Sequence, residues 1–179
     1  AAARRRLRNP VLFTLQSDGY PQAEIANYFL RYSFNELSAD YVIFIDCDEY
    51  LPFPSRSSLL DALRIDRAGW LYLNWRNICP VDLDGGGIFQ GRFIAAAALS
   101  KFTKVIVGRP LFEANPNLLV TQGYHIVTGI TSGAQPQCLS NAGLLHMPVQ
   151  SRAKYLSKIR ESAAAILRTP HLRENQLGN

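Results

Sequence analysis

The chain has 179 residues, of which 47% are hydrophobic and 11% aromatic, so we expect one domain spanning residues 1–179 with a substantial core. No apolar run approaches the roughly 20 residues that cross a bilayer, so no transmembrane segment is expected. The net charge is +5, but the Lys and Arg residues are scattered rather than interleaved with aromatic residues. This pattern does not indicate a nucleic-acid surface, and it suits a small anionic ligand such as a nucleotide diphosphate.

The first part of the chain predicts a strand–helix–strand unit. After residues 1–10, a basic segment that we expect to be solvated and disordered, residues 11–15 are typical of a strand. Apolar residues recur at helical spacing over residues 22–37, and residues 41–45 form a second apolar run. Such a crossover joins parallel strands. We therefore expect an α/β fold, Rossmann-like, with a mostly parallel mixed sheet flanked by helices and with Asp18 on its ligand-binding edge.

Three acidic residues follow the apolar run at 41–45: Asp46, Asp48 and Glu49. Ligands of open α/β sheets lie at the carboxyl ends of strands, so Asp46 and Asp48 can point into one crevice. Carboxylate oxygens suit Mn²⁺ or Mg²⁺, which proteins commonly share with substrate phosphates. The alternative is that both aspartates only form the turn. We favour the metal interpretation because so apolar a strand rarely ends in this pattern.

The middle of the chain predicts short elements around a glycine-rich loop. Ser57 is a suitable cap for a helix that ends near residue 65. The loop at 77–91 contains Asp82, Asp84 and three consecutive glycines, which is typical of a backbone that approaches a ligand and equally of a plain surface loop. The other expected elements are strands at 70–75, at 102–107 and within 118–127, and a short helix at 93–99.

The last third predicts a strand at 141–147 that leads onto His146. A lone histidine is as often structural as it is a ligand. Because a sheet edge collects strand ends, we expect His146 to lie beside Asp48 and to complete the metal site.

An amphipathic helix is expected next, from a cap at Ser151 to residue 167. Its free N–H groups and positive dipole end favour a phosphate, and Arg152 and Lys158 can add charged hydrogen bonds. A solvated helix face is the alternative for these two basic residues. The apolar stripe of the helix consists of Leu156, Ile159, Ala163 and Ile166.

The three cysteines, Cys47, Cys79 and Cys138, are odd in number and lack the spacing of a metal site. We interpret them as unpaired, reduced residues in or near the core of a cytosolic protein. The expected location is the cytoplasm, either free or peripheral at the membrane.

Four segments, taken together and in this order, resemble the family-two-like glycosyltransferases of the GT-A fold. The resemblance covers residues 11–158. The segments are 44–49 (Phe-Ile-Asp-Cys-Asp-Glu), 74–76 (Asn-Trp-Arg), 104–110 (Lys-Val-Ile-Val-Gly-Arg-Pro) and the block from His146 through Ser151 and Arg152 to Lys158.

The resemblance implies transfer of a sugar, with inversion, from a nucleotide-diphosphate sugar to a glycan or other hydroxyl acceptor. It assigns Asp48 to direct ligation of the metal and Asp46 to the ribose or to a metal-bound water. A carboxylate base must accept the proton of the acceptor hydroxyl; Asp84, Asp82 and Glu113 are the candidates.

The sequence also departs from this family. Ser151 precedes Arg152 where the family order is Arg-Ser, and a glutamate is missing near residues 90–93. The first strand–helix unit, which holds the nucleotide base, is expected to be missing before residue 11, as in a piece of a longer protein. An inactive sugar-nucleotide or glycan-binding module is therefore one alternative. Another is a haloacid-dehalogenase-like phosphatase, with Asp46 as nucleophile and Asp48 as general acid.

Overall fold

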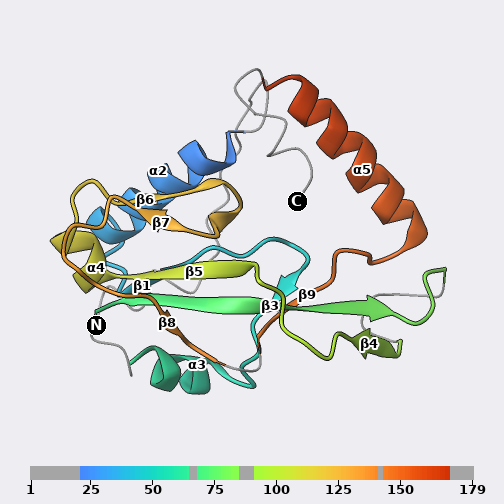
Figure 1. Ribbon diagram of the computed structural model, residues 1–179, viewed down its shortest axis with the longest axis horizontal. Helices are drawn as coiled ribbons and strands as arrows, with labels where there is room; N and C mark the ends of the chain where they lie inside the picture. Colours follow the sequence, from blue (N-terminus) through green and yellow to red (C-terminus); the bar gives the residue numbers. More distant parts are fainter. Residues whose placement is uncertain (1–20, 65–67, 85–90, 141–142, 170–179) are drawn as a thin grey trace.

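The computed structural model describes residues 21–64, 68–84, 91–140 and 143–169, and its centre is a mixed α/β arrangement around a curled sheet (Figure 1). Strands in this part of the chain form a main sheet in the order β1-β5-β3-β9-β2, with β4 and β8 also paired to β3. Its strands are β1 (Tyr41–Ile43), β2 (Glu49–Tyr50), β3 (Trp70–Pro80), β4 (Phe93–Ala95), β5 (Thr103–Gly108), β8 (Gln137–Cys138) and β9 (Leu144–His146).

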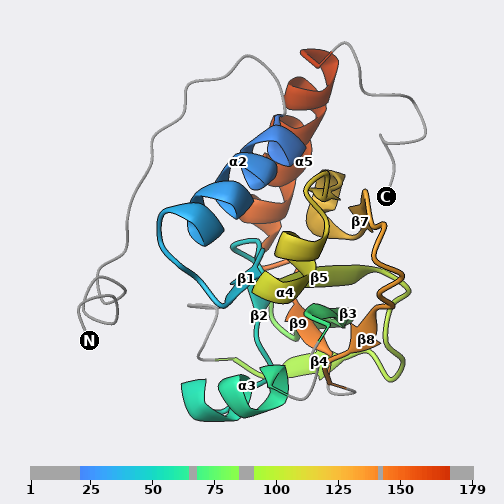
Figure 2. The same ribbon diagram turned by 90° about the vertical axis from the view of Figure 1, so that its left-hand side faces the viewer.

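Helices and one small hairpin surround this sheet (Figure 2). The hairpin pairs two short strands that flank a 3-10 turn. These elements are α2 (Gln22–Asn35), α3 (Arg56–Leu63), α4 (Arg109–Ala114), β6 (Leu119–Val120), η1 (Gln122–Tyr124), β7 (Val127–Thr128) and α5 (Arg152–Leu167).

The prediction of a mostly parallel sheet is wrong. Between described strands, β5 pairs antiparallel with both β1 and β3, and β2 pairs antiparallel with β9; only β8 and β9 run parallel to β3. The expectation depended on a strand at 11–15, which lies outside the described residues, and β1 instead lies beside β5. An apolar run reports burial and does not fix the direction of the neighbouring strand.

Strand β5 divides the core into two layers. Val105 and Val107 face one layer together with residues of α2, and Ile106 faces the other with Leu63 of α3. Successive side chains of a strand point to opposite faces, so one apolar strand can serve both layers. The sheet is thereby covered on both sides, with α2 and α3 on opposite faces (Figure 2).

Two local predictions also differ from the structure. The segment at 93–99 contains strand β4 rather than a helix, because β3 extends to Pro80 and its far end offers an edge for pairing. Ser55, not Ser57, caps α3 in a reciprocal arrangement with Ser58. The helix expected from a cap at Ser151 to residue 167 is confirmed as α5, and none of its residues is buried.

The three cysteines are free, as predicted, but their expected core location is wrong because all are exposed. Cys47 lies in the turn formed by residues 46–49, which we call the acidic turn. Cys79 lies on the end of β3 beyond the core. The basic segment 1–10 and Asp18 are outside the described residues. None of the described helices combines the length and apolar character needed to cross a membrane.

Candidate functional site

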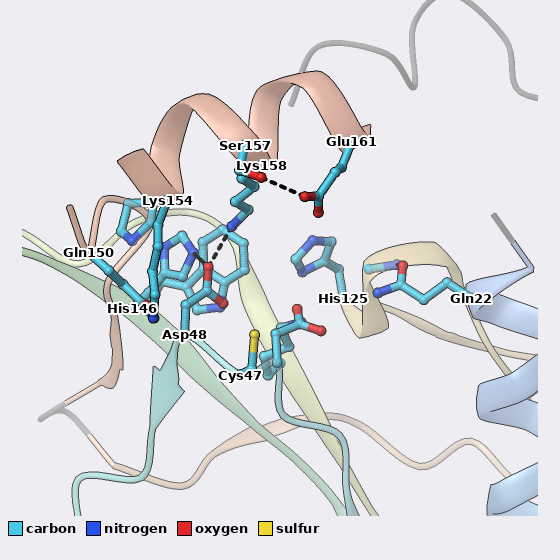
Figure 3. A pocket seen from close by; sticks show the side chains of 15 residues that line it. Gln22, Cys47, Asp48, His125, His146, Gln150, Lys154, Ser157, Lys158 and Glu161 are labelled. Carbon is cyan, nitrogen blue, oxygen red and sulfur yellow. Dashed lines mark hydrogen bonds and ion pairs between the residues drawn. The ribbon is translucent and has the colours of Figure 1, made fainter. Parts of the chain in front are cut away.

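A pocket of about 850 Å³ lies where the acidic turn, β5, β9 and α5 meet (Figure 3). Its wall combines acidic, basic and imidazole side chains that are far apart in the sequence. They include Asp46, Asp48, Lys104, His125, His146 and Lys158.

Strand pairing brings Asp48 and His146 together. Glu49 of β2 stands opposite His146 of β9, and the backbone N–H of Met147 donates to the Asp48 carbonyl at 2.8 Å. The Nε2 atom of His146 lies 3.9 Å from Oδ2 of Asp48. The prediction that these residues are neighbours is therefore confirmed, although an antiparallel pair, and not a parallel sheet edge, joins them.

The His146 ring is held in one orientation. Its Nδ1 lies 2.8 Å from Oδ1 of Asn77, and the ring stacks on Trp75 with centroids 4.0 Å apart. Burial is the main cause that lowers the His146 pKa, and the Asp48 carboxylate only partly opposes it. The imidazole is thus neutral near pH 7, Nδ1–H donates to Asn77, and the Nε2 lone pair is left toward Asp48.

Lys158 reaches the same carboxylate from α5. Its Nζ donates to Oδ2 of Asp48 at 2.5 Å, and the side chain of Asp48 is only 10% exposed whereas that of Lys158 is 54% exposed. Burial by itself would lower the Lys158 pKa, but the hydrogen bond and the attraction to Asp48 outweigh it and raise the pKa. A protonated amine therefore sits beside Asp48, where an imidazole lone pair and a carboxylate converge (Figure 3).

A buried lysine forms ion pairs with two carboxylates of the acidic turn. Lys104 of β5 is 2% exposed, and its Nζ lies 2.6 Å from Oδ2 of Asp46 and 3.3 Å from Oε1 of Glu49. The second contact is an ion pair without good hydrogen-bond alignment. Oε2 of Glu49 accepts the Asp46 backbone N–H at 3.0 Å. Burial is the main cause that raises the Glu49 pKa, and Lys104 opposes it. Asp46 lines the pocket but is paired with Lys104.

His125 occupies the other side of the pocket (Figure 3). Its Nδ1 lies 2.5 Å from the carbonyl oxygen of Thr103, so Nδ1–H donates there and Nε2 keeps its lone pair. Burial is the main cause that lowers the His125 pKa. Gly123 adopts a positive φ of 73°, and a Cβ at this position would lie 2.6 Å from Nε2 of His125. Only glycine fits this close approach without displacing the ring.

The candidate bases predicted from sequence lie outside the pocket wall. Asp84 pairs with Arg152 at 3.3 Å, and both side chains are largely exposed. Asp82 accepts the backbone N–H of Asp84, and Glu113 pairs with Arg109 on α4. None of these residues lines the pocket beside Asp48. The composition of the loop that contains Asp82 and Asp84 did not reveal where the loop lies relative to the pocket.

Lys104 and His125 had no predicted role. Lys104 was detectable in principle, because a lysine within an otherwise mostly apolar strand needs a buried partner. His125 gave no such signal, since a single histidine beside a short turn does not reveal the pocket that it faces.

Two side chains of the pocket, those of Asp48 and His146, are potential ligands of a divalent ion. Among described residues, no group of three or more His, Cys, Asp or Glu side chains could hold a metal alone. Asp48 and His146 do supply a carboxylate and an oriented Nε2, and hydrogen bonding of the second ring nitrogen is usual for a ligating histidine. Ions such as Mg²⁺ are commonly held by one or two carboxylates together with substrate phosphates and water.

No protein-family model matches the chain, and no curated protein and no solved structure is significantly similar to it.

Proposed function

We propose that the chain is a metal-dependent glycosyltransferase of the GT-A type, which moves a sugar from a nucleotide-diphosphate sugar to a glycan or other hydroxyl acceptor. One observation carries the proposal: Asp48, His146 and Lys158 come from three separate segments and meet at one side of a pocket of about 850 Å³. This volume is in the range of pockets that hold small organic ligands.

Asp48 and His146 are the residues that would hold Mn²⁺ or Mg²⁺. When bound, such an ion neutralises the negative charge of the departing diphosphate. Lys158 is protonated and half-exposed, so its ammonium can turn from Asp48 to a phosphate oxygen. Lys154, one turn earlier on α5, also lines the pocket and adds positive charge on the same side. Asp46 would contact the ribose of the donor or a water bound to the metal.

His125 takes the role of base that Asp82, Asp84 and Glu113 were expected to fill. In an inverting transfer, the acceptor oxygen bonds to the anomeric carbon while the bond to the diphosphate breaks, and the acceptor proton goes to a base. Nε2 of His125 can accept this proton, because burial keeps the imidazole neutral and Nδ1–H is committed to Thr103. The base and the Asp48–His146 pair lie on different sides of the pocket (Figure 3).

We predict that His125→Gln reduces the transfer rate roughly 10²- to 10⁴-fold, the usual contribution of a general base. In the wild type, the rate should fall on acidification only below the ordinary histidine range, since the pKa of His125 is lowered. Rates measured against pH for both proteins check this, with Asp84→Asn as the matched control. A large loss in Asp84→Asn with little loss in His125→Gln would return the role of base to the loop.

The function itself is tested by incubating the chain with nucleotide-diphosphate sugars and Mn²⁺ and measuring release of the nucleoside diphosphate with sugar acceptors. Metal-dependent release, increased by an acceptor, is expected. A second candidate is an inactive sugar-nucleotide-binding module. It is favoured by the observation that the carboxylate bases predicted from the sequence do not line the pocket. It predicts donor binding without release. If no donor bound to the chain and no nucleoside diphosphate was released, both functions would be contradicted.

A further inference from the structure

Helix α5 presents opposite sides to different surroundings. Lys154, Ser157, Lys158 and Glu161 line the pocket. With about 100° of rotation per residue, these four residues occupy one side of the helix, and the large apolar residues occupy the other. No residue of α5 is buried. Figure 1 shows the helix at the edge of the molecule.

Large apolar side chains cover the outer side of α5. Tyr155 is 43% exposed, Leu156 47%, Ile159 48% and Leu167 86%. With Ala163 and Ile166 they form a stripe of about 120° along the whole helix. We call these six residues the outer stripe. An amphipathic helix in a globular protein normally turns this stripe toward the core, so its outward position points to something that covers it.

The charges of α5 indicate what kind of surface covers the outer stripe. The helix carries four basic residues and one acidic residue, a net charge of +3. Arg152 lies within the outer stripe, where it also pairs with Asp84, and Arg160 lies beside the stripe. Glu161, the acidic residue, lies on the opposite side in the pocket wall. A second copy of the chain would bring these basic residues against each other, whereas an anionic surface complements them.

We propose that the outer stripe docks α5 on an anionic lipid surface, with its axis in the plane of the membrane. Apolar residues on one side with basic residues at the edges are the pattern of helices that lie in the interface of a bilayer. Tyrosine suits the headgroup level. The residues of α5 that line the pocket are on the other side of the helix, so docking does not cover them. Docking of α5 is independent of the reaction that the pocket performs.

Co-sedimentation of the whole chain with vesicles tests this. We expect binding to vesicles of phosphatidylcholine mixed with phosphatidylserine, weakening as salt is raised, and little binding to phosphatidylcholine alone. The double variant Leu156→Gln/Ile159→Gln should bind roughly tenfold more weakly or worse. Arg160→Gln should lose roughly fivefold, the effect of one basic residue near an anionic surface.

Ile94→Gln is the matched control, since Ile94 is 66% exposed on β4, away from α5. It should bind like the wild type. Circular dichroism and melting of each variant separate loss of docking from loss of folding. Absence of vesicle binding by the wild type, or equal binding by the double variant, overturns the proposal. Self-association of the wild type that the double variant abolishes also overturns it, in favour of a second copy as the occupant.

Discussion

Replacement of Asp48 by asparagine is expected to reduce sugar transfer about 10²- to 10³-fold, the usual cost of removing one charge-stabilising group. Asn has nearly the same shape as Asp but contributes no negative charge to a divalent ion. Folding should change little, because Lys158 is half-exposed and can turn its ammonium to water. The measurements are kcat/KM for a nucleotide-diphosphate sugar and the melting temperature without metal.

Asp84→Asn is the control for this variant, since Asp84 is an exposed carboxylate outside the pocket wall. It should retain transfer within a few-fold of the wild type. If Asp48→Asn kept normal activity, Asp48 would be a structural partner of Lys158 only. If it lost activity and melted far below the wild type, the loss would report folding and not catalysis.

Replacement of Lys104 by methionine is expected to destabilise the fold by about 3–5 kcal/mol, the typical cost of breaking a buried ion pair from one side. The Lys104 side chain is 2% exposed and that of Glu49 is 0% exposed, so water cannot replace the lost partner. Urea unfolding of the wild type and the variant measures the difference. Lys101→Met is the matched control, because Lys101 is an exposed lysine next to the same strand, and it should change stability by less than about 0.5 kcal/mol.

The loss in Lys104→Met should depend on pH. Burial already raises the Glu49 pKa above its usual value, and Lys104 is the main side chain that opposes this. Without the lysine the folded-state pKa rises further, so the folded protein binds a proton more readily than the unfolded chain does. Stability of the variant then falls as pH rises from the unfolded pKa of Glu49 through the folded one. The deficit should be largest at neutral pH and shrink in mild acid. A deficit that does not change with pH would show that Glu49 is not the residue left unpaired.

The sequence allowed the site to be predicted better than the sheet. Asp48 and His146 each follow an apolar run, and they were expected to meet at a shared edge of parallel strands. They are neighbours for a different reason, because Glu49 of β2 pairs with His146 of β9 in antiparallel strands. The direction of β1 was not predictable, because it depends on which strand lies beside it and not on its own residues. Short strands carry too little pattern to decide this.

Side chains that act through tertiary contacts were the hardest to predict. The helix start at Ser151 was found because a cap is local to the sequence. The position of the loop with Asp82 and Asp84 depends on how far β3 extends. The orientation of the His125 side chain toward the pocket depends on the turn at Gly123. The outward position of the α5 stripe could not be predicted either, since periodicity identifies a stripe but not what covers it.

The central claim is that Asp48 and His146 hold a divalent ion together with a nucleoside diphosphate. The most direct measurement is titration of Mn²⁺, followed by electron paramagnetic resonance, into the wild type, Asp48→Asn and His146→Gln with UDP present. We expect the wild type to bind Mn²⁺ tightly only with UDP, and each variant to bind at least roughly tenfold more weakly while its fold is retained. Equal Mn²⁺ affinity in all three proteins, or no binding by the wild type, would contradict the claim.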